Sequence, residues 1–205
     1  MAFVVFEGLD ASGKSTLIKS VEEVLRQRNI SFTTTREPGG SPLADKIREL
    51  ILYPGDEIPC AKAELLLYQA SRAQHVDKVI KPAIDKKEWV LCDRFTASSI
   101  AFQAGGRGIE VNEVKKLNEF SIDGNEPHLY ILLDLEVSES AKRIAGREEK
   151  NRLDVEKTEF HEKVRQSYLS QAKEDPKNWL ILDASKPTKN MLLEVISCFE
   201  ERNYL

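Results

Sequence analysis

A glycine-rich stretch near the start of the chain, "EGLDASGKST", contains residue types that bind phosphate groups. Gly8 is followed after four residues by Gly13, Lys14 and Ser15, which is the spacing of a phosphate-binding loop. In such a loop backbone N–H groups turn inward around an anion, the lysine reaches the outer phosphates and the hydroxyl binds Mg²⁺. We therefore expect a nucleoside triphosphate here. The residues predicted to contact it are Gly8, Leu9, Asp10, Ala11, Ser12, Gly13, Lys14, Ser15 and Thr16.

Charged side chains stand at the ends of two other predicted strands. Asp93 ends the apolar run "WVLCD" and Arg94 follows it, while Arg36 follows "ISFTTT". Ligands of parallel sheets bind outside the carboxyl ends of the strands. Asp93 there can organise hydrated Mg²⁺ together with Ser15, and a guanidinium group suits a phosphate. We predict that Arg36 and Arg94 bind a phosphate on the acceptor of a phosphoryl transfer; a surface ion pair is the alternative for each.

Apolar runs and helical periodicity alternate along the chain and position these residues. Short apolar runs predict strands at 3–7, 30–35, 89–93, 129–135 and 179–184. Helical spacing predicts helices over 14–28, 43–52, 61–78, 96–103, 111–121, 138–146, 155–173 and 188–202. Parallel strands need crossover connections, so this order predicts an α/β fold with a five-stranded parallel sheet and helices on both faces.

Composition narrows the classes of function. The 205 residues suit a single domain, 1–205, and the net charge of −4 provides no overall basic field for a nucleic acid. No apolar run reaches membrane-spanning length, and the three cysteines have neither zinc nor disulfide spacing, so we expect no membrane partner and a cytoplasmic location. The guanine-reading Asn-Lys-x-Asp motif of switch GTPases is absent. A small-molecule kinase fits best.

Longer motifs resemble one family, the thymidylate kinases. They are "FEGLDASGKST", "TREPGGSPLADKIREL", "YQASRAQHVDKVIKPAI", "DRFTASSIAFQAGGRG" and "NRLDVE". The first only indicates a kinase, whereas the second, third and fourth together are specific to this family, and the resemblance covers nearly the whole chain. It implies a P-loop kinase fold with a short lid at about 143–154. It also implies transfer of the γ-phosphoryl group of MgATP to dTMP in dTTP biosynthesis, by a homodimer.

The resemblance also implies roles for residues around dTMP. Asp10 matches the carboxylate that accepts a hydrogen bond from the 3′-hydroxyl, Tyr68 the ring that stacks on thymine, and Arg72 the group that binds a thymine carbonyl. Phe102 matches a ring against the sugar that disfavours a ribose 2′-hydroxyl. The other dTMP contacts that it implies are Arg36, Arg94, Ser98, Ser99 and Gln103. Residues 105–108, "GGRG", are expected to close over the acceptor as a flexible turn.

The remaining catalytic charge is expected in the lid. In members of the family without arginine after the loop aspartate, an arginine of the lid stabilises the transition state, and here that position is Ala11. The catalytic residues implied are Lys14, Arg94, Arg147 and Arg152, and Arg143 is a weaker candidate. Asn151 and Asp154 replace the usual acids of the lid. Glu7 can either orient water on the metal or cap the sheet. Other readings are a deoxynucleoside kinase and a nucleotide-binding protein without transferase activity.

Overall fold

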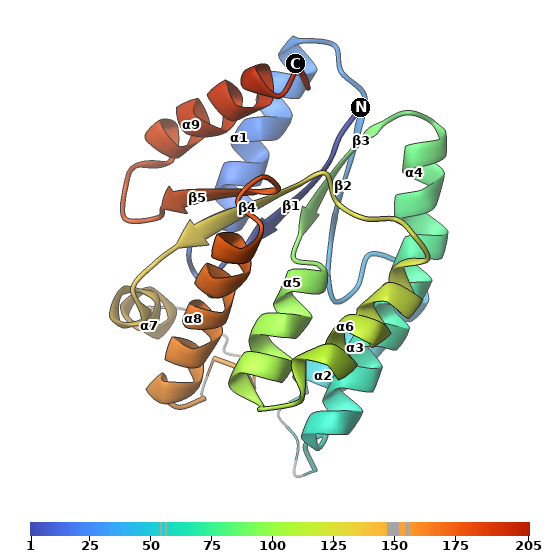
Figure 1. The fold of residues 1–205 in the computed structure, drawn as a ribbon, viewed down its shortest axis with the longest axis vertical. Coiled ribbons are helices and arrows are strands. Elements are labelled where there is room, and N and C mark those ends of the chain that lie inside the picture. Colours follow the sequence, from blue (N-terminus) through green and yellow to red (C-terminus); the bar gives the residue numbers. More distant parts are fainter. Residues whose placement is uncertain (54, 56, 147–151, 155) are drawn as a thin grey trace.

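The computed structural model describes residues 1–205 except 54, 56, 147–151 and 155. This part of the chain contains one five-stranded, fully parallel sheet with the strand order β2-β3-β1-β4-β5. The strands are β1 (Phe3–Glu7), β2 (Phe32–Arg36), β3 (Trp89–Asp93), β4 (Leu129–Asp134) and β5 (Trp179–Asp183). The predicted α/β fold with a five-stranded parallel sheet is confirmed (Figure 1).

Helices cover both faces of this sheet (Figure 1). Their bounds are α1 (Lys14–Gln27), α2 (Pro42–Leu52), α3 (Ala61–His75), α4 (Lys81–Asp85), α5 (Thr96–Ser99), α6 (Val111–Ile122), α7 (Val137–Ala145), α8 (Thr158–Glu174) and α9 (Thr188–Glu201). Two π-helical segments, η1 (Val76–Ile80) and η2 (Ile100–Gly106), extend α3 and α5. No helix within the described ranges is both long enough and apolar enough to cross a bilayer.

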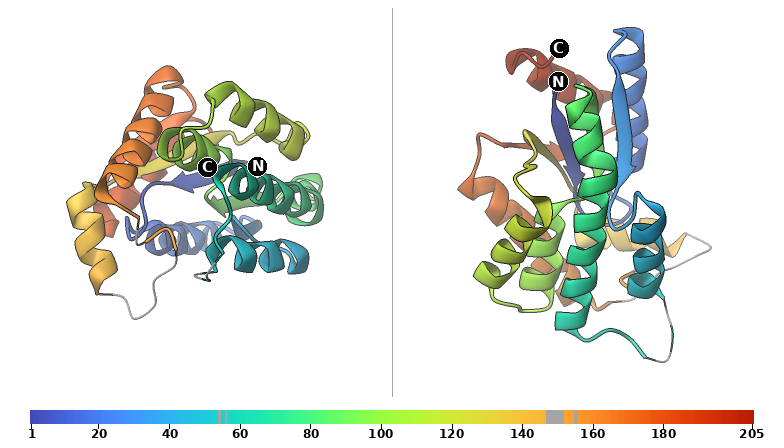
Figure 2. Two further views of the ribbon diagram at one scale, coloured as in Figure 1. Left: turned by 90° about the horizontal axis from the view of Figure 1, so that it is seen from below. Right: turned by 90° about the vertical axis from the view of Figure 1, so that its right-hand side faces the viewer.

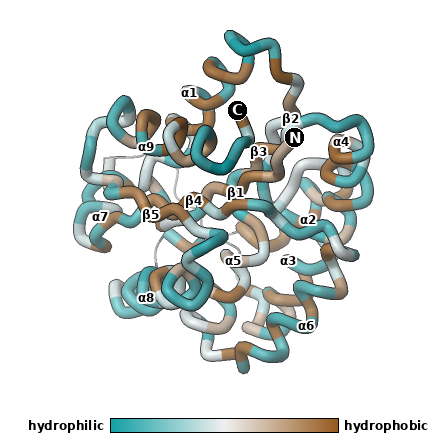
Figure 3. The backbone as a smooth tube through the Cα atoms, turned by 45° about the horizontal axis from the view of Figure 1, so that its top comes forward, coloured by the Kyte–Doolittle hydropathy of each residue, from teal (hydrophilic) through white to brown (hydrophobic). Residues whose placement is uncertain are grey.

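The central strand β1 supplies side chains to both halves of the core. Val4 and Phe6 pack in the cluster formed with α1 and α9, whereas Phe3 and Val5 pack in the cluster that includes η1. Successive strand residues point to opposite faces, so a strand covered by helices on both sides has to be apolar throughout. All five residues of β1 are buried. Apolar residues accordingly follow the strands through the centre of the molecule (Figure 3).

Some element boundaries differ from those predicted. The predicted helix 61–78 is α3, and η1 and α4 continue α3 without a break as one long helix (Figure 2). The predicted helix 96–103 is the short α5 followed by η2. Strand 30–35 is displaced to Phe32–Arg36, and helix 155–173 begins at Thr158. Periodicity cannot separate α-helix from π-helix, because one inserted residue changes the hydrogen bonding and leaves the apolar pattern almost unchanged.

The expectation of a flexible turn at 105–108 is wrong for its first two glycines. Gly105 and Gly106 belong to η2, which packs against α8. An added Cβ would lie 2.8 Å from the side chain of Ser167 at Gly105 and 2.4 Å from the ring of Phe160 at Gly106. These glycines therefore allow close helix packing, and only Gly108, with a φ of 76°, has the left-handed backbone of a turn.

Candidate active site

The loop between β1 and α1 forms one wall of a polar pocket, here called the phosphate-loop pocket. Its lining residues from this loop and the first turn of α1 are Asp10, Ala11, Ser12, Gly13, Lys14, Ser15 and Thr16. Gly8 begins the loop with a φ of 136°, and a Cβ there would lie 2.5 Å from the carbonyl oxygen of Leu133. Only glycine fits this position, because the backbone conformation and the neighbouring strand both exclude a side chain. Gly13 ends the loop as the N-cap of α1.

Lys14 points back into the loop that it follows. Its Nζ donates hydrogen bonds to the carbonyl oxygens of Gly8, at 3.2 Å, and Leu9, at 3.0 Å. Burial lowers the pKa of Lys14 and the Arg94 guanidinium lowers it further, while nearby carboxylates oppose both effects. Of the predicted triphosphate contacts, Gly8 and Leu9 do not line the pocket, and the Leu9 side chain is part of the hydrophobic core. Their carbonyl groups instead hold the lysine.

Ser15 and Asp93, predicted as the metal-binding pair, lie together in this pocket. The Ser15 hydroxyl donates to the Asp93 carboxylate at 3.2 Å. The two come from the first turn of α1 and the end of β3, whose neighbour in the sheet is β1. A hydroxyl and one carboxylate beside a phosphate-binding loop are the hard oxygen donors that Mg²⁺ takes alongside phosphate oxygens. The residues present therefore fit Mg²⁺.

A second pocket, here called the aromatic pocket, adjoins the first and is lined by the rings of Tyr68, Phe95 and Phe102. Of the residues predicted to contact dTMP, those that line it are Asp10, Tyr68, Arg72, Arg94, Ser98, Phe102 and Gln103. Arg36 lines the phosphate-loop pocket only. The Ser99 side chain is fully buried outside both pockets, and its hydroxyl has no hydrogen-bond partner among the described residues. The structure therefore gives Ser99 no direct contact with the aromatic pocket.

Arg72 enters the aromatic pocket as part of a buried polar network. Its guanidinium group donates to Glu37 Oε2 at 2.8 Å, to Asn118 Oδ1 at 2.7 Å and to the carbonyl oxygen of Phe95 at 2.9 Å. The other carboxylate oxygen of Glu37 lies 3.0 Å from Nδ1 of His75. Because bonds from several elements fix this guanidinium, its orientation toward the pocket does not depend on a ligand.

Arg48 of α2 lines both pockets and is the main residue that the sequence analysis missed. It donates to the carbonyl oxygen of Pro38 at 2.9 Å, and burial together with the charge of Arg36 lowers its pKa. The predicted Arg36 is 60% exposed and lies 3.8 Å from Asp45. The signal for Arg48 was its place in the motif "TREPGGSPLADKIREL", on the helix that follows the Pro-Gly-Gly turn.

Arg94 connects the two pockets and lines both. Its guanidinium group donates to Asp10 Oδ1 at 2.9 Å, to the Tyr168 hydroxyl at 3.0 Å and to the Ser98 hydroxyl at 3.3 Å. It also lies 5.1 Å from the centre of the Phe102 ring. Although burial alone would lower the pKa of Arg94, the charge of Asp10 and other acidic groups raise it well above its usual value. Arg94 is therefore a fixed positive charge between the pockets.

Glu7, for which the sequence left two roles open, takes a structural one. Its carboxylate is fully buried and accepts hydrogen bonds from the backbone N–H groups of Phe95 and Ser98 and from the hydroxyls of Ser98 and Tyr168. Burial raises the pKa of Glu7, and Arg94 and these donors oppose that rise. Glu7 thus joins the end of β1 to the turn after β3 and to α8, and holds the residues that surround Arg94.

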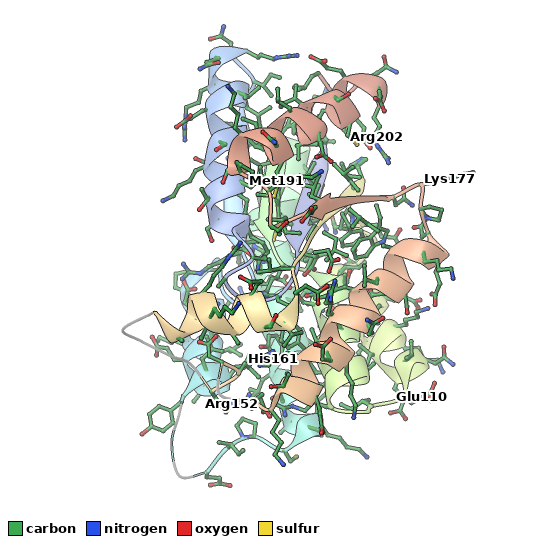
Figure 4. All side chains as sticks on the ribbon, turned by 90° about the vertical axis from the view of Figure 1, so that its left-hand side faces the viewer. Glu110, Arg152, His161, Lys177, Met191 and Arg202 are labelled. Carbon is green, nitrogen blue, oxygen red and sulfur yellow. The ribbon has the colours of Figure 1, made fainter. Side chains whose placement is uncertain are left out.

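The described lid arginines make contacts other than those expected of a transition-state residue. Arg143 donates to the carbonyl oxygens of Ala11, at 3.2 Å, and Ala184, at 3.1 Å, so it ties α7 to the phosphate-binding loop. Arg152 is buried below α7 (Figure 4) and lines neither pocket. It donates to Glu64 Oε2 at 2.7 Å. Arg147 and Asn151 lie outside the described residues, so their predicted roles stay predictions.

Comparisons with known proteins show the family of this chain. The family model described as thymidylate kinase matches residues 6–195. The thymidylate kinase of Bdellovibrio bacteriovorus is 48% identical over all of this chain and 98% of its own length, and that of Clostridium novyi is 41% identical over 95% of this chain and 96% of its own. A crystal structure of thymidylate kinase from Ehrlichia chaffeensis superposes with a TM-score of 0.78 at 30% identity and covers 97% of this chain and 98% of its own. The chain therefore belongs to the thymidylate kinase family.

Proposed function

We propose that the two adjoining pockets bind the two substrates of the family's reaction face to face. The chain is an ATP-dependent dTMP kinase, which transfers the γ-phosphoryl group of ATP to dTMP and gives dTDP and ADP. The observation that carries the assignment of the pockets is their shared wall. Four residues, Asp10, Glu37, Arg48 and Arg94, line both pockets, so ligands that fill them meet at the same charged groups.

The donor side is the phosphate-loop pocket. Backbone N–H groups of residues 10–16 and Lys14 bind the β- and γ-phosphates, since the N-terminus of α1 and the lysine both present positive charge. Ser15 and Asp93 hold the metal site, whose Mg²⁺ would neutralise charge on the phosphates. A Mg²⁺ titration of Asp93→Asn should then show half-maximal activity at a higher Mg²⁺ concentration than wild type. An unchanged Mg²⁺ requirement would remove Asp93 from the site.

The acceptor side is the aromatic pocket. Tyr68 offers a ring face for the thymine base, Arg72 a fixed donor for its carbonyl, and Phe102 bulk beside the sugar. Asp10 accepts a hydrogen bond from the 3′-hydroxyl, and Gln103 and Ser98 add polar contacts. The acceptor phosphate lies between Arg94 and Arg48 at the shared wall, with Arg36 at its exposed side. Bidentate guanidinium groups suit this phosphate, because both present planar pairs of donors.

Phosphoryl transfer between the two pockets depends on positive charge around the phosphates and not on a proton-transfer step. An oxygen of the dTMP phosphate is already anionic at neutral pH and attacks the γ-phosphorus directly, so no general base is required. Lys14 and Arg94 supply charge from the described part of the chain. Arg147 is proposed as the lid arginine from the sequence alone. Arg152 is held by Glu64 in this structure.

Substrate preference tests the assignment. ADP release should be stimulated by dTMP and dUMP and not by dCMP, AMP or shikimate, because only a thymine or uracil edge offers Arg72 a carbonyl at the matching position. Equal stimulation by dCMP would contradict the placement of the base against Arg72. Turnover of thymidine but not of dTMP would favour a deoxynucleoside kinase.

We also propose that the enzyme acts in the cytosol as a homodimer. The cysteines, Cys60, Cys92 and Cys198, are all free, which suits a reducing compartment. On adjacent helices α3 and α6, Leu66 is 56% exposed and Phe120 is 85% exposed. Large apolar side chains exposed on neighbouring helices favour a partner of the same kind. Light scattering should give the mass of two chains for wild type and of one chain for Phe120→Glu.

A further inference from the structure

Glu64, in the first turn of α3, is a fully buried carboxylate that belongs to neither pocket. Three side chains from distant parts of the chain donate to it. Gln103 Nε2 lies 3.0 Å from Oε1, and the Arg107 guanidinium lies 3.2 Å from Oε1 and 3.1 Å from Oε2. Arg152 lies 2.7 Å from Oε2. One carboxylate therefore joins α3, the end of η2 and the segment before α8.

Each donor connects Glu64 to the aromatic pocket. Gln103 lines the pocket directly. Arg152 is followed by Leu153, which lines it too, and Arg152 also donates to the carbonyl oxygen of Ile51, next to the lining residue Leu52. Holding Arg152 therefore holds two apolar groups of the pocket wall.

Arg107 extends this network to the segment that leads into α8. It pairs with Glu156 at 2.7 Å and lies 4.6 Å from the centre of the Phe160 ring. The centre of the Phe160 ring in turn lies 6.0 Å from the centre of the Phe102 ring, and Phe102 lines the aromatic pocket. Glu64 is thus linked to the pocket wall on three sides.

The charge of this network favours an ionised Glu64. Burial alone would raise the pKa of Glu64, but hydrogen bonds from Arg107, Gln103 and Arg152 lower it below its ordinary value. Two guanidinium groups then share one buried carboxylate. Removing its charge would leave the buried Arg152 guanidinium without this carboxylate and Arg107 with Glu156.

We propose that Glu64 is a positioning residue for the nucleotide acceptor and that Arg152 acts through Glu64, not on the transferring phosphoryl group. Glu64 holds Gln103, Leu153 and Leu52 at the distances that fit the base and sugar of a pyrimidine monophosphate. This inference rests on the proposed function, because it assigns the acceptor to the aromatic pocket. It predicts that changes in the network weaken dTMP binding and leave ATP binding almost unchanged.

Steady-state kinetics of Glu64→Gln against wild type provide the first test, with thermal melting to show that each variant is folded. Losing a charge-assisted hydrogen bond of this kind should raise KM for dTMP at least ~10-fold, while KM for ATP stays within about twofold. Glu64→Asp, which keeps the charge, should recover part of the affinity. The matched control is Glu200→Gln on α9, which breaks an exposed ion pair to Arg28 at the end of α1 and should leave both KM values unchanged.

Arg152→Lys separates positioning from transition-state stabilisation. A lysine still reaches one carboxylate but cannot bind Glu64 and Ile51 together, so KM for dTMP should rise and kcat should stay within about threefold. An arginine that stabilises the transferring phosphoryl group would instead lose about 10³-fold or more in kcat. In the double variant with Glu64→Gln, the rise in KM for dTMP should be smaller than the product of the two single rises, because both changes disturb the same Arg152–Glu64 contact.

The outcomes are distinct. If wild type turns over dTMP but Glu64→Gln lowers kcat with both KM values unchanged, Glu64 is only structural and the inference fails while the proposed function stands. A 10³-fold loss of kcat in Arg152→Lys also overturns it. If wild type shows no dTMP-dependent turnover, the proposed function fails and the inference fails with it. Should Glu64→Gln not fold, Arg107→Gln, whose side chain is 18% exposed, must show the same selective rise in KM for dTMP.

Discussion

The Arg94 guanidinium donates a hydrogen bond to the Asp10 carboxylate at 2.9 Å, and both side chains line the phosphate-loop pocket and the aromatic pocket. Asp10 comes from the loop after β1 and Arg94 from the turn after the neighbouring strand β3. The pair therefore brings an acidic and a basic group to the place where the proposed donor and acceptor meet. An acidic side chain in a phosphate-binding loop is tolerated here because a guanidinium group neutralises it.

The 3′-hydroxyl contact of Asp10 predicts a change in substrate preference. Wild type should prefer dTMP over 3′-deoxythymidine monophosphate by at least about tenfold in kcat/KM, because a site built to bind a hydroxyl rejects the analogue that lacks it. In Asp10→Ala, which removes the acceptor, this ratio should fall toward one. Absolute rates with both substrates will also drop, since Arg94 loses its partner, so the ratio is the informative quantity. An unchanged ratio would place the 3′-hydroxyl elsewhere.

The two arginines near the shared wall should differ in importance. Arg48 is half-buried and lines both pockets, whereas Arg36 is 60% exposed and lines one. Arg48→Ala should raise KM for dTMP by about 10–100-fold, the effect of a hydrogen bond to a charged group, and Arg36→Ala by much less, because water competes for an exposed guanidinium. Kinetics of both variants beside the exposed Arg28→Ala provide the comparison. If Arg36→Ala raised KM for dTMP more than Arg48→Ala, Arg36 would be the more important of the two arginines.

The ring of Tyr68 matters more than its hydroxyl in the proposed site. Tyr68→Phe keeps the ring face and should leave KM for dTMP within about threefold. Tyr68→Ala removes the stacking surface, which is worth about 1–3 kcal/mol per base, and should weaken dTMP binding by about 5–100-fold. Calorimetric titration with dTMP measures both. Equal losses in the two variants would show that the hydroxyl, not the stacking surface, carries the contact.

Replacing Lys14 should impair phosphoryl transfer without weakening the binding of dTMP. It lines the phosphate-loop pocket but not the aromatic pocket. Lys14→Ala should lower kcat by about 10²–10³-fold, because it removes positive charge from the phosphates, while the Kd for dTMP measured without ATP stays near that of wild type. Loss of dTMP binding in this variant would indicate that the lysine supports the whole loop through its bonds to Gly8 and Leu9.

Glu64 also predicts a pH dependence of stability. Hydrogen bonds hold the pKa of its folded state below the ordinary 4.5, so the unfolded chain binds this proton more readily than the folded one. The stabilisation is fully present above about pH 5 and is lost as the pH falls below 4.5 and through the folded pKa. The difference in unfolding free energy between wild type and Glu64→Gln, from urea titrations, should therefore narrow on acidification. A difference in unfolding free energy that grows on acidification would contradict the lowered pKa of Glu64.

The phosphate-binding half of the site was predictable because its geometry is local. Gly8, Gly13, Lys14 and Ser15 are neighbours in sequence, and a strand followed by a helix suffices to place them. The five strands were predictable for a similar reason. Strands covered on both faces are apolar throughout, so β1 can be recognised without knowing its partners.

The resemblance to thymidylate kinases extended the prediction to the acceptor side. It indicated Tyr68, Arg72 and Phe102, which the structure brings into one pocket although the first comes from α3 and the last from η2. It also indicated Ser99, which lies outside that pocket. Ser98 and Ser99 are adjacent in α5 and therefore project about 100° apart around the helix, so only one of them faces the pocket.

The amino-acid sequence by itself determined the phosphate-binding loop, the parallel sheet and the class of reaction, because these depend on short spacings and on apolar patterns. Tertiary structure alone decided which charged groups meet. Glu64 and Arg152 are 88 residues apart, and Arg94 and Asp10 are 84 apart, yet each pair lies within hydrogen-bond distance. No local pattern encodes such pairs, since their distance depends on how the helices pack over the sheet.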